Sequence, residues 1–294
     1  MNILITGGSG FIGSELSSFF IKKGYNITIL SRKSSNIAEI KVINSVKSIP
    51  IEEKIDVIIN LAGAAINKRW SNAYKKELIN SRLKITQDII SLTKKLIVKP
   101  SLLISASAIG YYGLQNNNHI NESSEYKDDF THKMCSFWEE EAKKVKEFGV
   151  RICITRMGVV LGQNGGALKK MLPIFKLGLG GKIGSGKQWF SWIHIGDVIG
   201  VFEFLINNKK QEGIFNLTSP NPVNNWKFTR ILGGILNRPT IFTIPAFIIH
   251  LVFGQMGNSL LLSGSAIYPD KLLKCLYRFQ YESLTEALKN ILKK

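Results

Sequence analysis

The chain has 294 residues, of which 45% are hydrophobic and 20% are charged, a composition typical of a globular protein and not of a disordered one. Its formal net charge is +18 at pH 7, and its three cysteines are scattered without C-x-x-C spacing. Such cysteines argue against a disulfide framework or a zinc site and favour a reducing compartment. We therefore expect a cytoplasmic protein without a bound metal.

The first 33 residues predict a strand, a glycine-rich turn, a helix and a second strand. Ile3 to Ile5 form a short apolar run, Thr6 to Gly13 form the turn, and the helical pattern ends at Gly24. In this context the glycines predict a dinucleotide site, because they let the backbone approach a pyrophosphate that the helix N-terminus attracts. The residues assigned to the cofactor here are Gly7, Gly10, Phe11, Ile12 and Gly13.

The end of the second strand, Ile27 to Leu30, indicates which dinucleotide is bound. Ser31-Arg32-Lys33 stands where an NAD-preferring site usually has an acidic residue, and the next acid is Glu39. Arg32 could pair with a 2′-phosphate through its planar guanidinium, the alternative being a solvated arginine at a strand end. We predict NADP(H), with Ser31 and Arg32 in the cofactor site.

Further strands and helices follow in alternation. Residues 41–46 could form a third strand, and residues 54–64 are typical of a buried parallel strand that runs into the small residues Ala62-Gly63-Ala64. A helix is predicted over 71–96, a strand over 102–105, a helix over about 131–148 and a strand over 150–156. This alternation predicts an α/β fold, a Rossmann doubly wound parallel sheet. We assign Leu61, Ala62, Gly63 and Ser105 to the cofactor edge.

The second half of the chain loses this rhythm after residue 162. We predict a Rossmann domain over 1–162, to which 191–217 return, and a smaller C-terminal substrate lobe over 163–294. The lobe should be rich in loops, with helices at 225–236 and 284–292. The apolar stretch 241–253 is too short to span a bilayer, so we interpret it as core or as a surface that another element covers, and we expect no membrane partner.

The positive charge is concentrated in this second half. Residues 1–147 carry 21 basic and 15 acidic side chains, whereas 148–294 carry 18 and 6, and no acid lies between Glu147 and Asp197. Such a field suits an anionic small-molecule substrate. A nucleic acid would also benefit from it, but we expect none, because the aromatic residues near Lys182 and Lys187 are better explained by packing.

A combination of motifs along the whole chain resembles the extended short-chain dehydrogenase/reductases. It is most similar to their atypical branch, the nucleoside-diphosphate-sugar epimerase-like "epimerase family", also labelled as cell-division inhibitors. The motifs are Thr6-Gly7-Gly8-x-Gly10-Phe11-Ile12-Gly13, Asn60-Leu61-Ala62-Gly63, Asn80-Ser81-Arg82, Ser105-Ala106-Ser107-Ala108-Ile109-Gly110-Tyr111-Tyr112-Gly113, Arg156-x-Gly158-x-x-Leu161-Gly162 and Ser191-Trp192-Ile193-His194. The chain departs from the family pattern at Gly254-Gln255-Met256, where the second residue is usually Glu.

The resemblance implies a catalytic serine, tyrosine and lysine, and the last two are missing. Ser107 stands at the serine position, but Thr131 and Cys135 replace the Tyr-x-x-x-Lys pair. The resemblance then leaves Ser107 and a tyrosine, Tyr111 or alternatively Tyr112, as candidate catalytic residues, with Tyr111 the one we assign, although both tyrosines could simply pack over the cofactor. Arg82 is assigned to the cofactor site and could hold a phosphate or polarise a carbonyl, unless it is a structural residue, and the same choice applies to Arg156.

Two functions remain open from the sequence. One is an NADP(H)-binding oxidoreductase or epimerase that acts on a small, anionic or nucleotide-sugar-like substrate without the usual pair. The other is a non-catalytic NADP-binding regulatory protein related to cell division. The superfamily often forms homodimers, and the sequence leaves the oligomeric state open.

Overall fold

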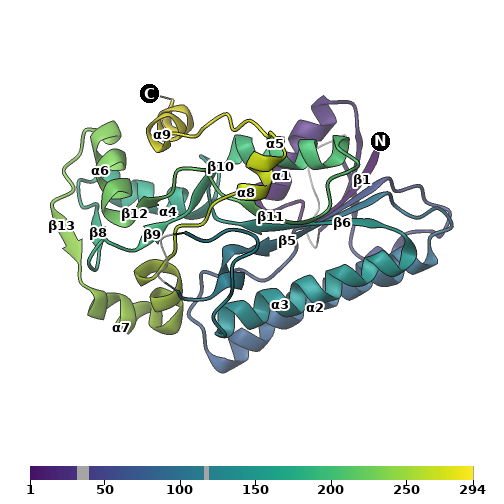
Figure 1. Cartoon of the computed structure of the whole chain (residues 1–294), viewed down its shortest axis with the longest axis horizontal. Helices are drawn as coiled ribbons and strands as arrows, with labels where there is room; N and C mark the ends of the chain where they lie inside the picture. Colours follow the sequence, from purple (N-terminus) through teal and green to yellow (C-terminus); the bar gives the residue numbers. More distant parts are fainter. Residues whose placement is uncertain (32–39, 116–118, 294) are drawn as a thin grey trace.

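A seven-stranded parallel sheet forms the centre of the computed structural model, which describes residues 1–31, 40–115 and 119–293 (Figure 1). The strand order is β11-β6-β5-β4-β1-β2-β3. The strands are β1 (Asn2–Thr6), β2 (Asn26–Leu30), β3 (Ile40–Ile43), β4 (Val57–Asn60), β5 (Leu102–Ala108), β6 (Arg151–Met157) and β11 (Gly213–Leu217). The order reverses between β1 and β4, where open α/β sheets bind ligands. The predicted doubly wound Rossmann fold is confirmed.

Helices cover both faces of the sheet because its strands are apolar on both sides. Ile3 and Ile5 of β1 pack with Leu16 in one core, whereas Leu4 between them packs with Ile89 in another. Helices α1 (Phe11–Lys22) and α5 (Ile195–Asn207) cover the first face, and α2 (Asn72–Lys95) and α3 (Phe130–Lys143) cover the second. The pair α2 and α3 runs along one side of the molecule in Figure 1.

Side-chain caps explain where the two long helices begin. The Ser71 hydroxyl accepts a hydrogen bond from the Tyr74 amide at 3.1 Å, and the Asp129 carboxylate accepts one from the His132 amide at 2.9 Å. The helix predicted to end near residue 148 instead stops at Lys143, and a 3₁₀ turn, η3 (Lys144–Phe148), continues to Gly149.

Several short elements of the second half pack around another core, which includes Leu168, Trp192, Phe228 and Leu288. The remaining elements of the described residues are β7 (Val159–Leu161), α4 (Gly166–Lys176), β8 (Gly181–Ile183), β9 (Trp189–Phe190), β10 (Trp192–His194), β12 (Val223–Asn224), α6 (Asn225–Leu236), β13 (Phe242–Ile244), α7 (Ala246–Gly257), α8 (Asp270–Lys274) and α9 (Leu284–Leu292), with the turns η1 (Val46–Ser48), η2 (Ile109–Tyr112) and η4 (Asn258–Leu262). Helices α4 and α5 were not predicted from the sequence. The division at residue 162 stays a prediction.

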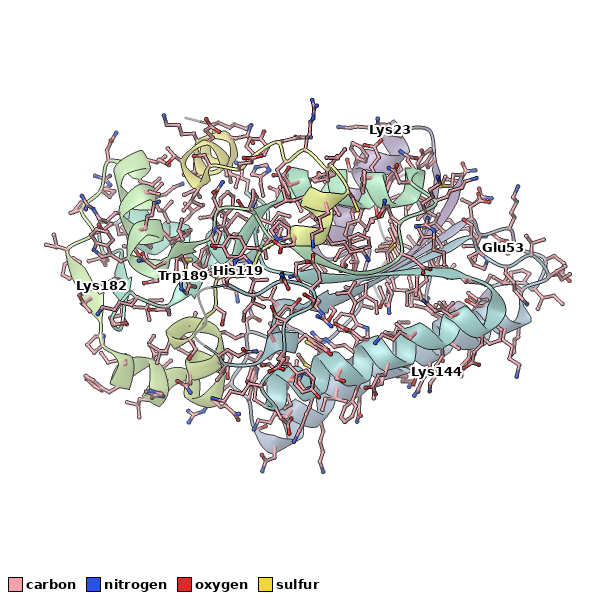
Figure 2. The ribbon with its side chains drawn as sticks, in the orientation of Figure 1. Lys23, Glu53, His119, Lys144, Lys182 and Trp189 are labelled. Carbon is pink, nitrogen blue, oxygen red and sulfur yellow. The ribbon has the colours of Figure 1, made fainter. Side chains whose placement is uncertain are left out.

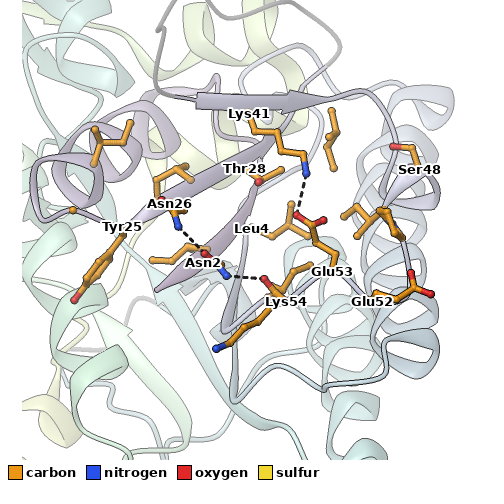
Figure 3. A pocket seen from close by; sticks show the side chains of 18 residues that line it. Asn2, Leu4, Tyr25, Asn26, Thr28, Lys41, Ser48, Glu52, Glu53 and Lys54 are labelled. Atoms are coloured by element: carbon orange, nitrogen blue, oxygen red, sulfur yellow. Dashed lines mark hydrogen bonds and ion pairs between the residues drawn. The ribbon is translucent and has the colours of Figure 1, made fainter.

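A cavity of about 850 Å³ opens at the amino-terminal ends of the strands (Figure 3). Asn2 at the start of β1 and Asn26 at the start of β2 share a hydrogen bond of 2.9 Å beside it, and Lys41 and Glu53 form an ion pair of 2.9 Å across it. Ligands of parallel sheets bind at the carboxyl ends of the strands, so this cavity lies at the opposite end from the predicted cofactor site.

Candidate functional site

The glycine turn after β1 is held in a shape that side chains would prevent. Gly7 has a φ of +72°, and its carbonyl accepts a hydrogen bond from the Gly10 amide at 2.9 Å. A Cβ atom on Gly13 would lie 2.3 Å from the Gly7 oxygen. Helix α1 therefore starts in direct contact with the turn, as close approach to a pyrophosphate requires.

The first turn of α1 is available to an anion. Gly10 is its N-cap, and among the described residues no side chain accepts a hydrogen bond from the amides that follow, which belong to Phe11, Ile12 and Gly13. A Cβ on Gly10 would meet just one atom within 4 Å, the Gly7 oxygen at 3.2 Å. The outer side of the turn is thus open, and these residues fit the phosphates of a dinucleotide.

The end of β4 is fastened to the same turn. The Leu61 amide donates to the Thr6 carbonyl at 3.1 Å, and the Thr6 hydroxyl donates to the buried Asn60 side chain at 2.7 Å. A Cβ on Gly7 would lie 3.0 Å from the backbone of Leu61 and Ala62. The structure therefore brings the predicted residues Leu61 to Gly63 against Gly7.

The other predicted cofactor residues lie at neighbouring strand ends. Ser31, just after β2, is buried and its hydroxyl donates to the Ser9 hydroxyl at 3.3 Å. Ser105 is buried in β5, in register with Asn60. Arg32 lies outside the described residues, so its predicted role stays a prediction.

Ser107 is part of a buried polar triad. Its hydroxyl donates to Glu139 Oε1 at 2.6 Å, and Arg156 binds both oxygens of the same carboxylate at 2.8 Å. Burial disfavours the charged form of Arg156. The hydrogen bonds and electrostatic attraction from Glu139 favour that form more strongly, so they hold the pKa of Arg156 above its usual value. The triad joins β5, α3 and β6 at the carboxyl end of the sheet.

The two tyrosines after β5 lie in different surroundings. Tyr112 is fully buried, its hydroxyl donates to Asn216 at 2.7 Å, and burial raises the pKa of Tyr112 to about 12. Tyr111 is partly exposed, and the centre of its ring lies 3.3 Å from the Arg156 guanidinium carbon. Of the two, Tyr111 is the one within reach of a ligand.

Thr131 and Cys135 lie one turn apart on α3 and face the segment after β5. A Cβ on Gly110 would lie 3.2 Å from Thr131 Cβ and 3.8 Å from Cys135 Sγ. The Thr131 hydroxyl donates to Asp129 at 2.7 Å, and burial raises the pKa of the Cys135 thiol to about 12. Cys135 is therefore an uncharged thiol at neutral pH.

Arg82 on α2 is a buried cation without a carboxylate partner in the described part of the chain. It is 9% exposed, and its guanidinium donates to the carbonyls of Leu78 at 2.8 Å and Ala64 at 3.2 Å. Its Nε has no acceptor among these residues, and burial lowers the pKa of Arg82. A Cβ on Gly63 would lie 3.0 Å from its central carbon, so the charge lies directly beside the end of β4.

Glu139 is the site residue that sequence reasoning missed. It belongs to the acidic run Glu139-Glu140-Glu141, a pattern typical of the solvent-exposed face of a helix. Its spacing of four from Cys135 and eight from Thr131 puts it on their face of α3, and this periodicity was the available signal. The spacing could not show that Arg156 of β6 lies against the Glu139 carboxylate and neutralises its charge.

Comparisons with known proteins agree with this fold and site. Residues 3–218 match the NAD dependent epimerase/dehydratase family, and residues 244–291 match a domain of unknown function, DUF1731. An epimerase family protein of Staphylococcus aureus (strain MRSA252) is 38% identical over 299 residues, which cover 99% of each chain.

Solved structures are similar over the full length. The human epimerase family protein SDR39U1, whose crystal structure contains NADPH, matches with a TM-score of 0.91 and 31% identity over 100% of both chains. A nucleoside-diphosphate sugar epimerase from Corynebacterium glutamicum matches with a TM-score of 0.80 and 28% identity, over 99% of this chain and 58% of that one. On these grounds the chain belongs to the NAD dependent epimerase/dehydratase family.

Proposed function

We propose that the protein binds NADP(H) along the carboxyl edge of β1, β4 and β5 and works as an oxidoreductase or epimerase on a small anionic substrate. The glycine turn and the uncapped start of α1 support the dinucleotide, and the human relative with NADPH supports the choice of dinucleotide. The nicotinamide ring would supply the hydride chemistry. Residues 163–294, apart from the segments that return to the sheet, would form the substrate lobe.

The observation that carries the substrate class is the uncompensated charge of Arg82. Two buried arginines lie in this region, and Glu139 neutralises just one of them, Arg156. A buried charge that no opposite charge balances is costly unless a ligand completes its surroundings. A carboxylate or phosphate group of the substrate, held beside Gly63, would offset the charge of Arg82.

In this proposal Tyr111 exchanges the proton and Ser107 is a positioning residue. The Ser107 proton points to Glu139, which holds Arg156 under the Tyr111 ring. Arg156 thus brings a guanidinium against Tyr111, whereas position 135, where the family pattern has a lysine, carries the uncharged Cys135.

The cofactor choice is tested with Arg32→Asp. We expect the wild type to prefer NADPH over NADH by roughly tenfold or more, about 1.4 kcal/mol, and the variant to lose this preference because an acid repels the 2′-phosphate. Fluorescence titration with both dinucleotides measures it. Equal affinities in the wild type, or a preference that the substitution leaves intact, would contradict the proposal.

The role of Arg82 is tested by comparing Arg82→Met with Arg156→Met. Arg82→Met should lower the free energy of unfolding by less than about 1 kcal/mol, because it removes a charge that no carboxylate balances. Arg156→Met leaves the buried Glu139 carboxylate without its cation and should lower it by about 3–5 kcal/mol. Single-turnover oxidation of bound NADPH by a panel of anionic carbonyl compounds and sugar nucleotides should be lost in Arg82→Met. Equal destabilisation of both variants with unchanged turnover would make Arg82 a structural residue.

A non-catalytic NADP-binding regulatory protein is the second candidate. It is favoured by the burial of Thr131 and Cys135 and by the commitment of the Ser107 proton to Glu139. A protein that binds NADPH tightly but oxidises it with no compound in the panel would support this function. A protein partner that the wild type captures, but that a variant with a disrupted glycine turn does not, would then show which interaction the cofactor controls.

A further inference from the structure

Helix α7 is mostly apolar although it lies at the surface, with His250 and Gln255 as its polar side chains. Ile249 is buried, yet the opposite side of the helix before its kink at Gly254 exposes 68% of Phe247 and 73% of Leu251. Ile248 and Val252 are also exposed and adjoin this side, because residues three and four apart are neighbours on a helix. A mostly apolar helix face at a surface is normally covered by protein or by lipid.

The elements before α7 extend this apolar surface. Ile241, just before β13, is 81% exposed, and β13 pairs with β8, so that Phe242 lies opposite Gly181. Leu177 and Leu179, after α4, are exposed as well, and the loop that contains them packs Gly178 against Pro239. Figure 1 shows β13 and α7 at the end of the molecule away from the N-terminus. We call the exposed residues Ile241, Phe242, Phe247, Ile248, Leu251 and Val252 the α7 face.

The segments around the α7 face are basic and contain no acid. Residues 163–194 and 213–269 lack Asp and Glu altogether. Their charged side chains are Lys169, Lys170, Lys176, Lys182, Lys187, Lys227, Arg230 and Arg238. Lys176 and Arg238 are exposed beside the apolar surface, where the Arg238 side chain donates to the Lys176 carbonyl at 2.8 Å. Lys182 marks this end of the molecule in Figure 2, opposite Glu53.

The positive charge and the apolar surface together limit which partner could cover the α7 face. A second copy of the chain would bring two acid-free basic surfaces together, which like-charge repulsion opposes. A nucleic acid matches the charge but offers no apolar phase for Phe247 and Leu251. An anionic bilayer offers both, because lipid headgroups attract Lys and Arg while the acyl boundary accepts apolar side chains.

We propose that the α7 face binds anionic lipid bilayers, with α7 lying in the plane of the interface. None of the helices in the described residues has the length and apolarity to cross a membrane, so the contact is peripheral. The proposal departs from the sequence-based expectation of no membrane partner, which rested on span length alone. It concerns the outer surface of the lobe proposed to hold the substrate, and its test does not depend on turnover.

The apolar part of the proposal is tested by co-sedimentation with vesicles of phosphatidylcholine, with and without phosphatidylglycerol. The wild type should bind the anionic vesicles roughly tenfold or more tightly than the neutral ones, and Phe247→Ser/Leu251→Ser should lose this binding. Ile97→Ser/Val98→Ser is the matched control, because it also replaces two exposed apolar residues, after α2. Circular dichroism and NADPH titration check that each variant is folded.

The charged part is tested with two charge reversals of equal size. Lys176→Glu/Arg238→Glu should weaken binding to anionic vesicles, whereas Lys54→Glu/Lys209→Glu, outside the acid-free segments 163–194 and 213–269, should not. Absence of vesicle binding by the folded wild type would overturn the proposal, as would equal binding by wild type and Phe247→Ser/Leu251→Ser. Dimers that dissociate in that variant, or DNA that binds the face in place of vesicles, would also overturn it.

Discussion

Replacing Gly13 by alanine will lower the affinity for NADPH roughly a hundredfold, about 2.8 kcal/mol. The added Cβ would lie 2.3 Å from the Gly7 oxygen and 2.7 Å from the Gly8 Cα. Both neighbours are backbone atoms, so the clash is relieved only by moving α1 away from the turn. That movement separates the amides at the helix start from the position of the pyrophosphate.

Gly234→Ala is the matched control for this substitution. Gly234 also lies inside a helix, α6, but a Cβ there meets nothing within 4 Å. Alanine at that position should leave NADPH affinity unchanged and stabilise the fold by roughly 0.5–1 kcal/mol, because glycine is a poor helix former. Fluorescence titration and thermal unfolding measure both effects. A folded Gly13→Ala protein with wild-type affinity would remove the turn from the cofactor site.

Much of the central sheet could be predicted because its signals are local. The run from Ile3 to Ile5, the glycine turn and the buried strand before Leu61 each show their structure in their own residues, and repetition of strand and helix then leaves few topologies. Helices α4 and α5 were missed for the opposite reason. α4 lies between glycines and contains Pro173, and α5 is too apolar to show a polar face.

The motifs could indicate where in the fold the candidate site lies, but not which of its side chains bind each other. The motifs placed Ser107, Arg82 and Arg156 near one edge, since all three stand at or beside the sheet. They could not show that the Ser107 proton and the Arg156 charge both go to Glu139, because that pairing joins three elements distant in sequence. They also could not show that Arg82, within the described part of the chain, receives no carboxylate. The two buried arginines therefore differ in whether an opposite charge balances them.

Glu139→Gln will destabilise the protein by about 3–5 kcal/mol, the usual cost of breaking a buried ion pair from one side. Glu139 is 1% exposed and accepts three hydrogen bonds, two from Arg156 and one from Ser107. An amide keeps the shape but cannot balance the guanidinium, so Arg156 would remain charged in a dry environment. Chemical denaturation of wild type and variant measures the loss.

A double-mutant cycle separates this charge effect from packing. Adding Arg156→Met to Glu139→Gln should restore most of the lost unfolding free energy, because the double variant no longer buries an unpaired cation. Arg82→Met in the same background should not recover it, because Arg82 contacts neither Glu139 nor Ser107 through a hydrogen bond within the described residues. Additive losses from Glu139→Gln and Arg156→Met would mean that the pair contributes through shape alone. A recovery specific to Arg156 would leave Arg82, among the described residues at this edge, as a buried charge for a ligand to balance.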